Sequence, residues 1–576
     1  MEFENNPERE EYLKARGKVV LNACPGSGKT TTIAYKLIQL IKECNKDFGN
    51  YSGIICLSFT NVAKDEINEK YKAFTGKLLG FPHDVSTIDS FIYSYITKPF
   101  IHLIDPTLGK VQIIDESNII DDILTKNYQL LRKHAKYLFK YRPSSIEYKI
   151  DGTTFSTIGG DGTQAYLNYC NAVKTQQLSL GLLKSSDSEY FALQVLNNFP
   201  RIGEWLTRRF PFMIIDEAQD TSEIQHSIFD KLIEIGLKNI EFVGDPYQSL
   251  YEFRDARPDL FYAKYQDRLN WNCLELMSCR RSSQSIINVY QKLRLGNEKK
   301  VSSTANIDIE KKICVLRYDD GQEIKCVEKY IEITEDYDNC QVVVRGKSMQ
   351  TLITGAGNSS VYPWKNSIPY YLVRAVNCYN NNEIKSAVNI LRSVVPEIEN
   401  PNINKLDSRE RVLELKSNSK YNALIMEVLK GVPSFNNTLE DWSKLSGTYL
   451  KNMFLLDDDI DFVLKKGKWL KQYKTSVSDL FDFKDNGLMV PVSTIHQVKG
   501  KTFDSILMIL SSTSQGQSIS LSDYSTPATF PNEKKRMIYV AMSRPIDLMV
   551  VGVPNSKYTN DEVKEILGED IEFIAC

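Results

Sequence analysis

A glycine-rich loop near the N-terminus constrains the fold of this 576-residue chain more than any other feature. The segment ACPGSGKT occupies residues 23–30, follows a short apolar run at 19–21 and precedes a helix-like stretch at 31–44. The pattern G-x-x-x-x-G-K-[ST] requires this strand–loop–helix context, although alanine replaces the first glycine here. The context predicts a phosphate-binding loop at the carboxyl end of a strand, with a chance glycine-rich turn as the alternative.

Further apolar runs of strand length recur along the chain, separated by helix-like stretches. They lie at residues 54–57, 213–215, 240–243, 342–344, 505–510 and 548–551. Strands that alternate with helices imply parallel sheets with ligands at the carboxyl ends of the strands. We therefore predict an α/β fold. Two stretches, at about 91–185 and 351–485, lack this rhythm and are interpreted as mainly helical insertions.

The composition is that of a soluble globular protein, with 42% hydrophobic and 25% charged residues. No apolar run is long enough to span a bilayer, and the N-terminus lacks a signal-peptide pattern, so we expect a cytoplasmic location without membrane contact. The 11 cysteines include no C-x-x-C pair, which predicts reduced structural thiols. A net charge of −2 neither suggests nor excludes nucleic acid.

The segment MIIDEAQD at 213–220 places two adjacent carboxylates directly after an apolar run. Downstream of a phosphate loop, Asp216 would hold Mg²⁺ and Glu217 would orient and deprotonate the attacking water. Lys29 would neutralise the β- and γ-phosphates, and the Thr30 hydroxyl would also ligate Mg²⁺. A solvated acidic turn is the alternative. The segment predicts a Mg²⁺-dependent nucleotide-hydrolysing site.

Several further segments follow one another in an order that resembles the UvrD/Rep/PcrA-type superfamily 1A DNA helicases. They are LSFTNVAK at 57–64, VGDPYQSLYEFR at 243–254, MSCRRS at 277–282, VR at 344–345, VSTIHQVKG at 492–500 and RMIYVAMSR at 536–544. The resemblance covers about residues 17–553 apart from the two insertions. It implies two RecA-like parallel-sheet lobes, each with a mainly helical inserted subdomain. The implied boundaries are lobe 1A at 1–92 and 186–277, subdomain 1B at 93–185, lobe 2A at 278–355 and 485–576, and subdomain 2B at 356–484.

The same resemblance implies the nucleotide contacts, with ATP and Mg²⁺ as cofactors and other NTPs left open. The implied catalytic residues are Lys29, Asp216, Glu217, Gln248, Arg280 and Arg544. The implied nucleotide-binding residues are Ala23, Cys24, Pro25, Gly26, Ser27, Gly28, Lys29, Thr30, Thr31, Arg280, Gly500 and Arg544. Arg280 and Arg544 would reach the γ-phosphate from the second lobe, where a fixed guanidinium can stabilise the charge on the transferring group. Gln248 would sense the γ-phosphate.

For DNA, the resemblance implies a single-strand track, on single-stranded or partly duplex DNA, with 3′ to 5′ movement. Its residues would be Phe59, Thr60, Asn61, Tyr251, Phe253, Arg254, Arg345 and His496. Aromatic side chains suit a grip that ignores sequence, because every base has a π-face. For each aromatic taken alone, core packing is the alternative, and His496 could simply pack.

Three departures from the family pattern concern the nucleotide base. Arg9, Glu10 and Glu11 occupy the region where the family carries a glutamine that reads adenine. Cys279 replaces an aromatic that stacks on the base, and Thr502 replaces a glutamate near the ribose. We therefore predict weak discrimination between ATP and other NTPs.

Two basic tracks lie in the insertions, at residues 126–142 and 465–471. The first interleaves six cations with Tyr128, Tyr137, Phe139 and Tyr141. Contact with DNA and a solvated helical face are equally compatible with each track.

Two functions from different classes remain open at this level. One is a nucleotide-driven single-strand DNA translocase or helicase. The other is a regulatory NTPase that senses DNA for a partner nuclease. The chain resembles in layout the GajB-like helicase subunits of Gabija-type anti-phage systems, which work with an OLD-type nuclease. A catalytically inactive scaffold is disfavoured, because all the expected catalytic side chains are present. The oligomeric state is open.

Overall fold

The computed structural model describes residues 3–108, 110–126, 131–150, 155–156, 163–252, 255–307, 311–354, 362–380, 383–401, 403, 405–458, 460–481, 490–512 and 518–576. The chain divides into two compact units. One comprises Met1–Gln350 with Met489–Cys576, and the other comprises Thr351–Leu488.

The first unit contains two six-stranded sheets, and every strand pair in the first of them is parallel. Its order is β10-β1-β9-β8-β2-β3. The strands are β1 (Lys18–Ala23), β2 (Ile54–Ser58), β3 (Asp84–Thr87), β8 (Phe212–Asp216), β9 (Asn239–Gly244) and β10 (Asn272–Leu276). Strands β2 and β8 are buried at every position, as expected when helices cover both faces of a parallel sheet.

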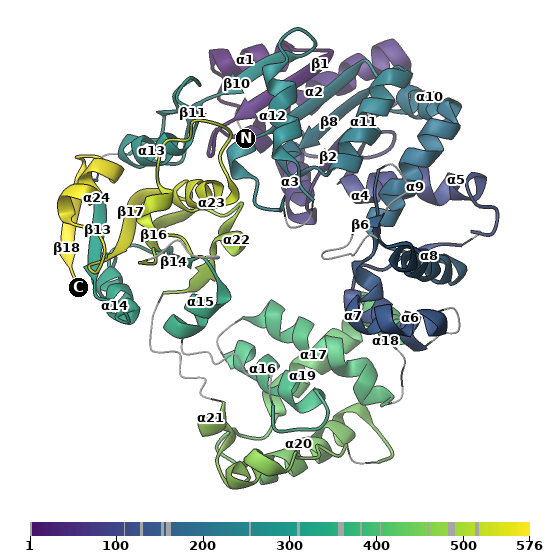
Figure 1. The fold of residues 1–576 in the computed structure, drawn as a ribbon, viewed down its shortest axis with the longest axis vertical. Helices are drawn as coiled ribbons and strands as arrows, with labels where there is room; N and C mark the ends of the chain where they lie inside the picture. The colour runs from purple at the N-terminus through teal and green to yellow at the C-terminus, as the bar shows by residue number, and fades with distance from the viewer. Residues whose placement is uncertain are drawn as a thin grey trace. The chain divides into compact units, whose positions relative to one another are not determined.

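The second sheet of this unit is also entirely parallel, in the order β15-β14-β16-β17-β13-β18. Its strands are β13 (Ile313–Tyr318), β14 (Cys340–Val344), β15 (Val492–Thr494), β16 (Phe503–Ile509), β17 (Pro545–Pro554) and β18 (Ile571–Ala575). The prediction of an α/β fold with two parallel sheets is therefore confirmed. Figure 1 shows β13, β16, β17 and β18 beside α14 (Glu323–Ile333) and α24 (Asn560–Leu567).

Helices connect the strands of both sheets. Besides α14 and α24, those of the first unit are α1 (Pro7–Lys14), α2 (Lys29–Phe48), α3 (Asn61–Thr75), α4 (Ile88–Phe91), α5 (Lys98–Phe100), α6 (Ser117–Lys126), α7 (Ala135–Lys140), α8 (Gln164–Ser179), α9 (Ser185–Asn198), α10 (Pro200–Arg209), α11 (Glu223–Ile235), α12 (Pro258–Gln266), α13 (Gln284–Tyr290), α22 (Ile495–Val498) and α23 (Glu533–Met542). The chain passes from the first unit to the second within α15 (Lys347–Thr354). Local sequence explains their starts: Ser222 and Gln225 form a reciprocal capping box at α11.

Alternating side chains of the strands divide the core of the first sheet into two clusters. Val20 packs in one cluster with Ile55 and Ile215. Val19 and Leu21 pack in the other, on the opposite face. Because successive strand residues point to opposite faces, one short apolar run supplies both cores and holds its carboxyl end rigidly.

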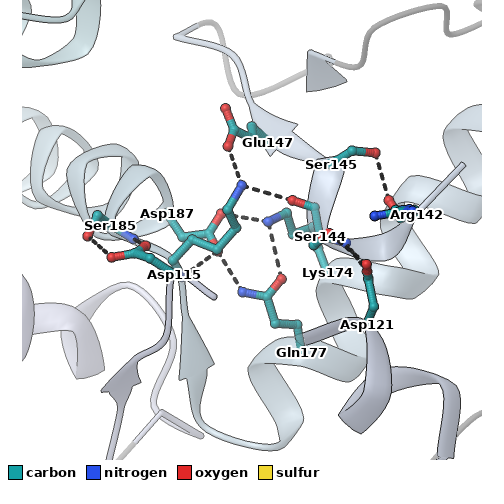
Figure 2. A network of polar contacts seen from close by, with 11 residues as sticks. Asp115, Asp121, Arg142, Ser144, Ser145, Glu147, Lys174, Gln177, Ser185 and Asp187 are labelled. Atoms are coloured by element: carbon teal, nitrogen blue, oxygen red, sulfur yellow. Dashed lines mark hydrogen bonds and ion pairs between the residues drawn. The ribbon is translucent and has the colours of Figure 1, made fainter. Parts of the chain in front are cut away.

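A buried polar network fixes the start of α9 (Figure 2). Lys174 Nζ of α8 lies 2.7 Å from Asp187 Oδ1, and Gln177 Nε2 donates to Asp187 Oδ2 at 2.6 Å. The backbone N–H of Lys184 also donates to Asp187 Oδ2, at 3.0 Å, and Lys184 Nζ donates to the Ser144 carbonyl at 2.9 Å. Asp187 is fully buried. Because both of its carboxylate oxygens have donors, the cost of burying this charge is offset.

The second unit is helical in its described part. Its helices are α16 (Ile368–Asn380), α17 (Ile384–Glu399), α18 (Lys405–Ser417), α19 (Ser419–Gly431), α20 (Leu439–Phe454) and α21 (Val477–Leu480). Trp364 and Trp442 are fully buried in its core. Each indole N–H has an acceptor, since Trp364 Nε1 donates to Ser443 Oγ at 2.8 Å and Trp442 Nε1 to the Pro433 carbonyl at 2.9 Å. The unit therefore has a core of its own.

Across the described residues, no helix combines the length and the apolar character needed to cross a bilayer. The eleven cysteines are all free thiols.

Candidate active site

The glycine-rich loop joins β1 to α2 at the carboxyl edge of the first sheet. Gly26 and Gly28 have φ angles of 74° and 78°, a region that glycine adopts without a steric cost. Helix α2 begins at Lys29. The N–H groups of its first turn lack intrahelical partners, and the positive end of the helix dipole favours an anion in front of them.

A cavity of about 710 Å³ opens at this loop and reaches residues from both sheets of the first unit. Its lining comprises Ala23, Cys24, Pro25, Gly26, Ser27, Gly28, Lys29, Thr30, Thr31, Phe59, Thr60, Val62, Ala63, Glu66, Glu217, Asp220, Gln248, Tyr251, Arg280, Arg281, Lys499, Gly500, Lys501, Thr502, Arg544 and Ile546. All the residues named from sequence for nucleotide binding therefore meet at one cavity.

Lys29 is held by the two carboxylates at the end of β8. Its Nζ lies 3.1 Å from Asp216 Oδ1 and 2.5 Å from Glu217 Oε1. Burial raises the pKa of Asp216 to about 6, against the opposing charge of Lys29. Burial acts in the same direction on Glu217, but the charges of Lys29 and Lys499 outweigh it and lower the pKa of Glu217 to about 2. Glu217 is consequently ionised at neutral pH and can accept a hydrogen bond from water.

The backbone at Glu217 is strained, and its carboxylate is aimed by a neighbouring amide. Its φ of 55° lies in the left-handed region, which is uncommon for a residue with a Cβ and concentrates at functional sites. Gln219 Nε2 donates to Glu217 Oε2 at 2.5 Å, and Gln219 Oε1 accepts from Asp245 N at 3.2 Å. A Cβ on Gly244 would lie 2.2 Å from Gln219 Oε1, so this approach needs glycine there.

An arginine from the second sheet lies in the same cavity. Arg544 is almost fully buried; its Nη2 donates to Gln248 Oε1 at 2.7 Å, and its Nε donates to the Val540 carbonyl at 3.0 Å. Gln248 Nε2 in turn donates to Asp245 Oδ2 at 2.9 Å. Burial, followed by the nearby charge of Arg281, lowers the pKa of Arg544 to about 9. The guanidinium is still protonated at neutral pH, and an anion in the cavity would balance its buried charge.

The adjacent residues Arg280 and Arg281 have different surroundings. Arg281 Nη1 donates to the Ser543 carbonyl at 3.0 Å, and burial lowers the pKa of its guanidinium. The backbone N–H of Arg280 donates to the Gly26 carbonyl at 2.9 Å, whereas its guanidinium pairs with Glu4. Sequence reasoning selected Arg280 alone. Arg281, which it passed over, is the arginine whose charge acts on Arg544.

Arg9, in the segment where the family resemblance places an adenine-reading glutamine, is buried against the phosphate loop. Arg9 is 3% exposed; its Nη2 donates to the Ser27 carbonyl and its Nη1 to the Glu4 carbonyl, both at 2.7 Å. A Cβ on Gly28 would lie 2.2 Å from Arg9 Nη2. Burial, and then the charge of Arg280, lowers the pKa of Arg9 to about 10. Arg9 therefore supports the phosphate loop.

Two aromatic side chains named for DNA contact lie face to face at the cavity. The ring centroids of Phe59 and Tyr251 are 5.2 Å apart, with an interplanar angle of 27°. Lys499 Nζ lies 4.5 Å from the centroid of Tyr251 and also pairs with Asp220. Sequence reasoning gave Lys499 no role, although it lies inside a quoted motif. Phe253 and Arg254 lie outside the described residues.

Of the other described residues named for DNA, Thr60 also lines the cavity. Thr60 Oγ1 accepts from Ala63 N at 3.2 Å and so caps α3, while Asn61 is the exposed first residue of that helix. Arg345 and His496 are neighbours: burial, and then the charge of Arg345, lowers the pKa of His496. Neither of these two lines the cavity.

The described aromatic residues of the first basic track pack within the protein. The Tyr137 ring lies 5.9 Å from the Tyr169 ring, and Tyr141 is 7% exposed. Lys133, Lys136 and Lys140 are exposed, and their contact with DNA stays a prediction. Tyr128 lies outside the described residues, as do the surroundings of the Phe139 side chain.

In the second track, Lys465 faces the protein, with its Nζ 4.5 Å from the centroid of Tyr362. Lys466 and Lys471 are exposed. Contact of these two lysines with DNA stays a prediction.

The site combines a phosphate loop on one parallel sheet with carboxylates at the end of a neighbouring strand. Arginines from a second parallel sheet complete it. This arrangement defines a two-lobed P-loop nucleotide hydrolase. Residues 5–268 match the family model of the UvrD/REP helicase N-terminal domain, and the chain is homologous to the Rep and PcrA helicases.

Two relatives illustrate the similarity. The chain is 24% identical over 500 residues to the ATP-dependent DNA helicase Rep of Buchnera aphidicola subsp. Acyrthosiphon pisum, covering 79% of this chain and 74% of Rep. It is 23% identical over 405 residues to the ATP-dependent DNA helicase PcrA of Staphylococcus aureus, covering 68% of this chain and 53% of PcrA. The match thus spans about half the length of PcrA.

Proposed function

We propose that this chain is a cytoplasmic motor that couples hydrolysis of a magnesium-bound NTP, ATP among them, to movement along or unwinding of DNA. The names of its relatives, ATP-dependent DNA helicases, support this function. The observation that carries the proposal is the position of Lys499. This one side chain pairs with Asp220, close after Glu217, and lies over the Tyr251 ring. Hydrolysis and the DNA track would therefore share a lysine.

The hydrolytic chemistry follows from the charges around the cavity. Lys29 neutralises the β- and γ-phosphate oxygens when a nucleotide enters, which frees Glu217 from its present partner. Gln219 keeps one Glu217 oxygen in place, and the other is then available to orient and deprotonate water. Gln248, hydrogen-bonded to Arg544, would transmit the presence of the γ-phosphate to the second sheet.

Thr30 and Asp216 fit a magnesium ion. Both offer hard oxygen ligands, and the Asp216 carboxylate is 1% exposed with Lys29 as its cationic partner. Mg²⁺ takes one or two protein oxygens together with phosphate oxygens and water, and no cluster of three or more His, Cys, Asp or Glu able to hold a metal occurs among the described residues. Thr30 and Asp216 would hold the ion, which would supply charge neutralisation at the phosphates.

Two buried guanidinium groups support stabilisation of the γ-phosphate from the second sheet. Arg544 and Arg281 both line the cavity, and their charges oppose each other. A phosphate between them would relieve this repulsion while gaining charge-assisted hydrogen bonds. We assign that function to Arg544 with Arg281, and a base-side position to Arg280, which pairs with Glu4.

The direction of movement in this proposal is 3′ to 5′, as the family resemblance implies. Phe59 and Tyr251 would hold bases by stacking, with Arg345 and His496 as further contacts. The proposed layout keeps lobe 1A at 1–92 and 186–277, subdomain 1B at 93–185, lobe 2A at 278–355 and 485–576, and subdomain 2B at 356–484. Closure of the cavity on a nucleotide would shift one lobe along the strand.

A regulatory NTPase that acts with a partner nuclease, as in anti-phage defence, is the second candidate function. The observation that favours it is the base side of the cavity. Arg280 lines the cavity and already pairs with Glu4. Arg9 does not line it and is engaged with the Ser27 carbonyl of the phosphate loop. Both side chains supply only donors. Such a pocket suits an enzyme that responds to several nucleotides.

Parallel measurements of NTP turnover and strand displacement separate the two functions. Turnover should rise when single-stranded DNA is added, and Lys29→Ala should abolish it. Displacement of a strand from a 3′-tailed duplex supports the motor, whereas DNA-stimulated turnover without displacement or translocation supports the regulatory NTPase. Turnover that is absent with and without DNA would contradict both.

A further inference from the structure

The exposed aromatic side chains of this protein are gathered at one place. Among the residues whose side chains the structure describes, only Phe48, Tyr51, Phe81 and Trp205 are exposed aromatics, at 47%, 83%, 79% and 57%. A monomeric protein rarely concentrates large exposed apolar side chains without an interaction to explain them. We name these four residues, with Arg201, Arg208 and Arg209, the aromatic edge.

Three chain segments bring these residues together. The Gly53 N–H donates to the Arg209 carbonyl at 2.8 Å, and Ser52 Oγ donates to the Arg208 carbonyl at 2.9 Å. The guanidinium carbon of Arg209 lies 5.3 Å from the centroid of Phe81. The loop after α2, the loop before β3 and the end of α10 therefore form one surface.

Phe48 and Trp205 belong to two of the same segments, the end of α2 and α10. The Phe48 ring lies 5.9 Å from that of Phe212, the first residue of β8. Trp205 precedes Arg209 by one helical turn and so shares its face of α10, while Ile202 and Leu206 point into the core. The exposed side chains of α10 therefore lie on a different face of the helix from the residues that pack into the core.

The aromatic edge lies at the opposite end of the first sheet from the candidate active site. It surrounds the amino ends of β2, β3 and β8, whereas Asp216 ends β8. Phe212 and Asp216 are four residues apart in β8, which at about 3.3 Å per residue separates the two ends by about 13 Å. Neither nucleotide hydrolysis nor the proposed DNA track uses this surface.

The charge around the edge is positive although the chain as a whole is slightly negative. The segments 46–53, 77–83 and 201–209 carry five lysines and arginines against two carboxylates, Asp47 and Glu204. Aromatic residues and arginine are the types enriched in protein–protein interfaces and their hot spots. Charge complementarity calls for an acidic partner, and it disfavours a second copy that would present the same cationic edge.

We propose that the aromatic edge binds an acidic, apolar segment of a partner protein. A protein partner is favoured over nucleic acid because large apolar side chains dominate the surface, and because Arg209 already covers the Phe81 and Phe210 rings. Nucleic acid would bind mainly through cations that reach phosphates.

The test uses the full chain and a fluorescent 15-residue peptide in which Asp and Glu alternate with Leu and Phe. The wild-type protein should bind it, and the Phe81→Ser/Trp205→Ser variant should bind at least tenfold more weakly, as should Arg201→Glu/Arg208→Glu. Leu269→Ser removes a 99% exposed apolar side chain elsewhere and should bind like the wild type. A peptide with Lys in place of every acid should not bind.

Two results would overturn the proposal. One is that the wild type and the Phe81→Ser/Trp205→Ser variant, with equal melting temperatures, bind the peptide with the same affinity, or that neither protein binds it. The other is a parallel loss of affinity for a single-stranded oligonucleotide in that variant, which would make the edge a nucleic-acid surface. Lys29→Ala should still bind the peptide, so failure of the proposed hydrolysis and failure of the docking surface are distinguishable.

Discussion

Arg544, directly before β17 of the second sheet, donates a 2.7 Å hydrogen bond to Oε1 of Gln248, which follows β9 of the first sheet. This bond links the two sheets directly beside the phosphate loop, since both residues line the same cavity. Gln248 also donates to Asp245 at the end of β9. In the proposed function, a change at the γ-phosphate would act on both strand ends through these bonds, as a nucleotide-driven closure requires.

Glu217→Gln should abolish turnover while leaving nucleotide binding intact. The amide keeps the shape of the side chain but cannot deprotonate water, so kcat should fall by about 10²–10⁴-fold. Phosphate release and binding of a fluorescent nucleotide measure the two effects. Glu66→Gln, a change at another acidic residue of the cavity lining, is the control. Turnover near the wild-type rate in Glu217→Gln would show that another group activates the water.

Arg544→Ala and Arg281→Ala should each lower kcat by about 10²–10³-fold, the loss typical of a removed charge-stabilising donor. Arg280→Ala, at the adjacent position, is the matched comparison and should lose less than about tenfold, because its guanidinium faces Glu4. Steady-state turnover at saturating NTP measures all three. A larger loss for Arg280→Ala than for Arg281→Ala would reverse our assignment.

Selectivity for the nucleotide base should be weak. Arg9 is committed to the Ser27 and Glu4 carbonyls, and Cys279 is fully buried, so neither is placed to distinguish adenine from guanine or cytosine. We expect kcat/KM values for ATP, GTP and CTP within about tenfold, equivalent to about 1.4 kcal/mol. Competition assays with mixed nucleotides measure this directly. Strict preference for ATP would contradict the prediction and point to a base contact outside these residues.

Phe59→Ala and Tyr251→Ala should weaken single-stranded DNA binding with little effect on turnover measured without DNA. Loss of base–aromatic stacking costs about 1–3 kcal/mol per base, or about five- to 150-fold in affinity. Fluorescence anisotropy with a poly(dT) oligonucleotide gives the affinity. Tyr247→Phe keeps a fully buried ring in place and is the control. Unchanged DNA affinity in both alanine variants would remove these residues from the track.

His226 should make the protein less stable as the pH falls. It is 2% exposed and stacks 5.7 Å from Phe242; burial lowers its pKa to about 3, with Lys264 and Arg257 acting in the same direction and Asp259 against them. The unfolded chain therefore binds a proton below about pH 6.5 that the folded chain excludes until about pH 3. Stability falls by up to about 1.4 kcal/mol per pH unit across that window.

His226→Phe keeps an aromatic ring against Phe242 without the titrating nitrogens. The difference in melting temperature between pH 7 and pH 5 should be smaller in this variant than in the wild type. Glu189 gives the stability a pH dependence of the opposite sign, because burial and then the charge of Asp89 raise its pKa. Acidification therefore stabilises the fold through this protonated group. Equal pH dependence in the two proteins would assign the acid sensitivity to other groups.

The architecture was predictable because its signals are local. The apolar run at β1, the loop glycines and the first turn of α2 are contiguous in the chain, so periodicity and turn chemistry predicted them together. Parallel sheets follow from the alternation of such runs with helices, whereas their division into two lobes was implied by the family resemblance. In the same way, the carboxylates at the end of β8 are adjacent in the chain to the strand that positions them.

Side-chain direction was not predictable, because neighbours in sequence diverge in space. Arg280 and Arg281 are adjacent, yet one meets Glu4 and the other the Ser543 carbonyl. No local pattern distinguishes these two outcomes, since each depends on which distant group lies opposite the guanidinium.

By itself, the sequence determined the α/β class, the position of the phosphate loop and the carboxylates that follow β8. Only the tertiary structure decided that Lys499 joins Asp220 to Tyr251, that Arg281 lies beside Arg544, and that four exposed aromatics meet at the far edge of the sheet. The reason is physical. Strand, loop and helix formation is encoded in neighbouring residues, whereas charge pairing and surface clustering depend on the packing of segments tens to hundreds of residues apart.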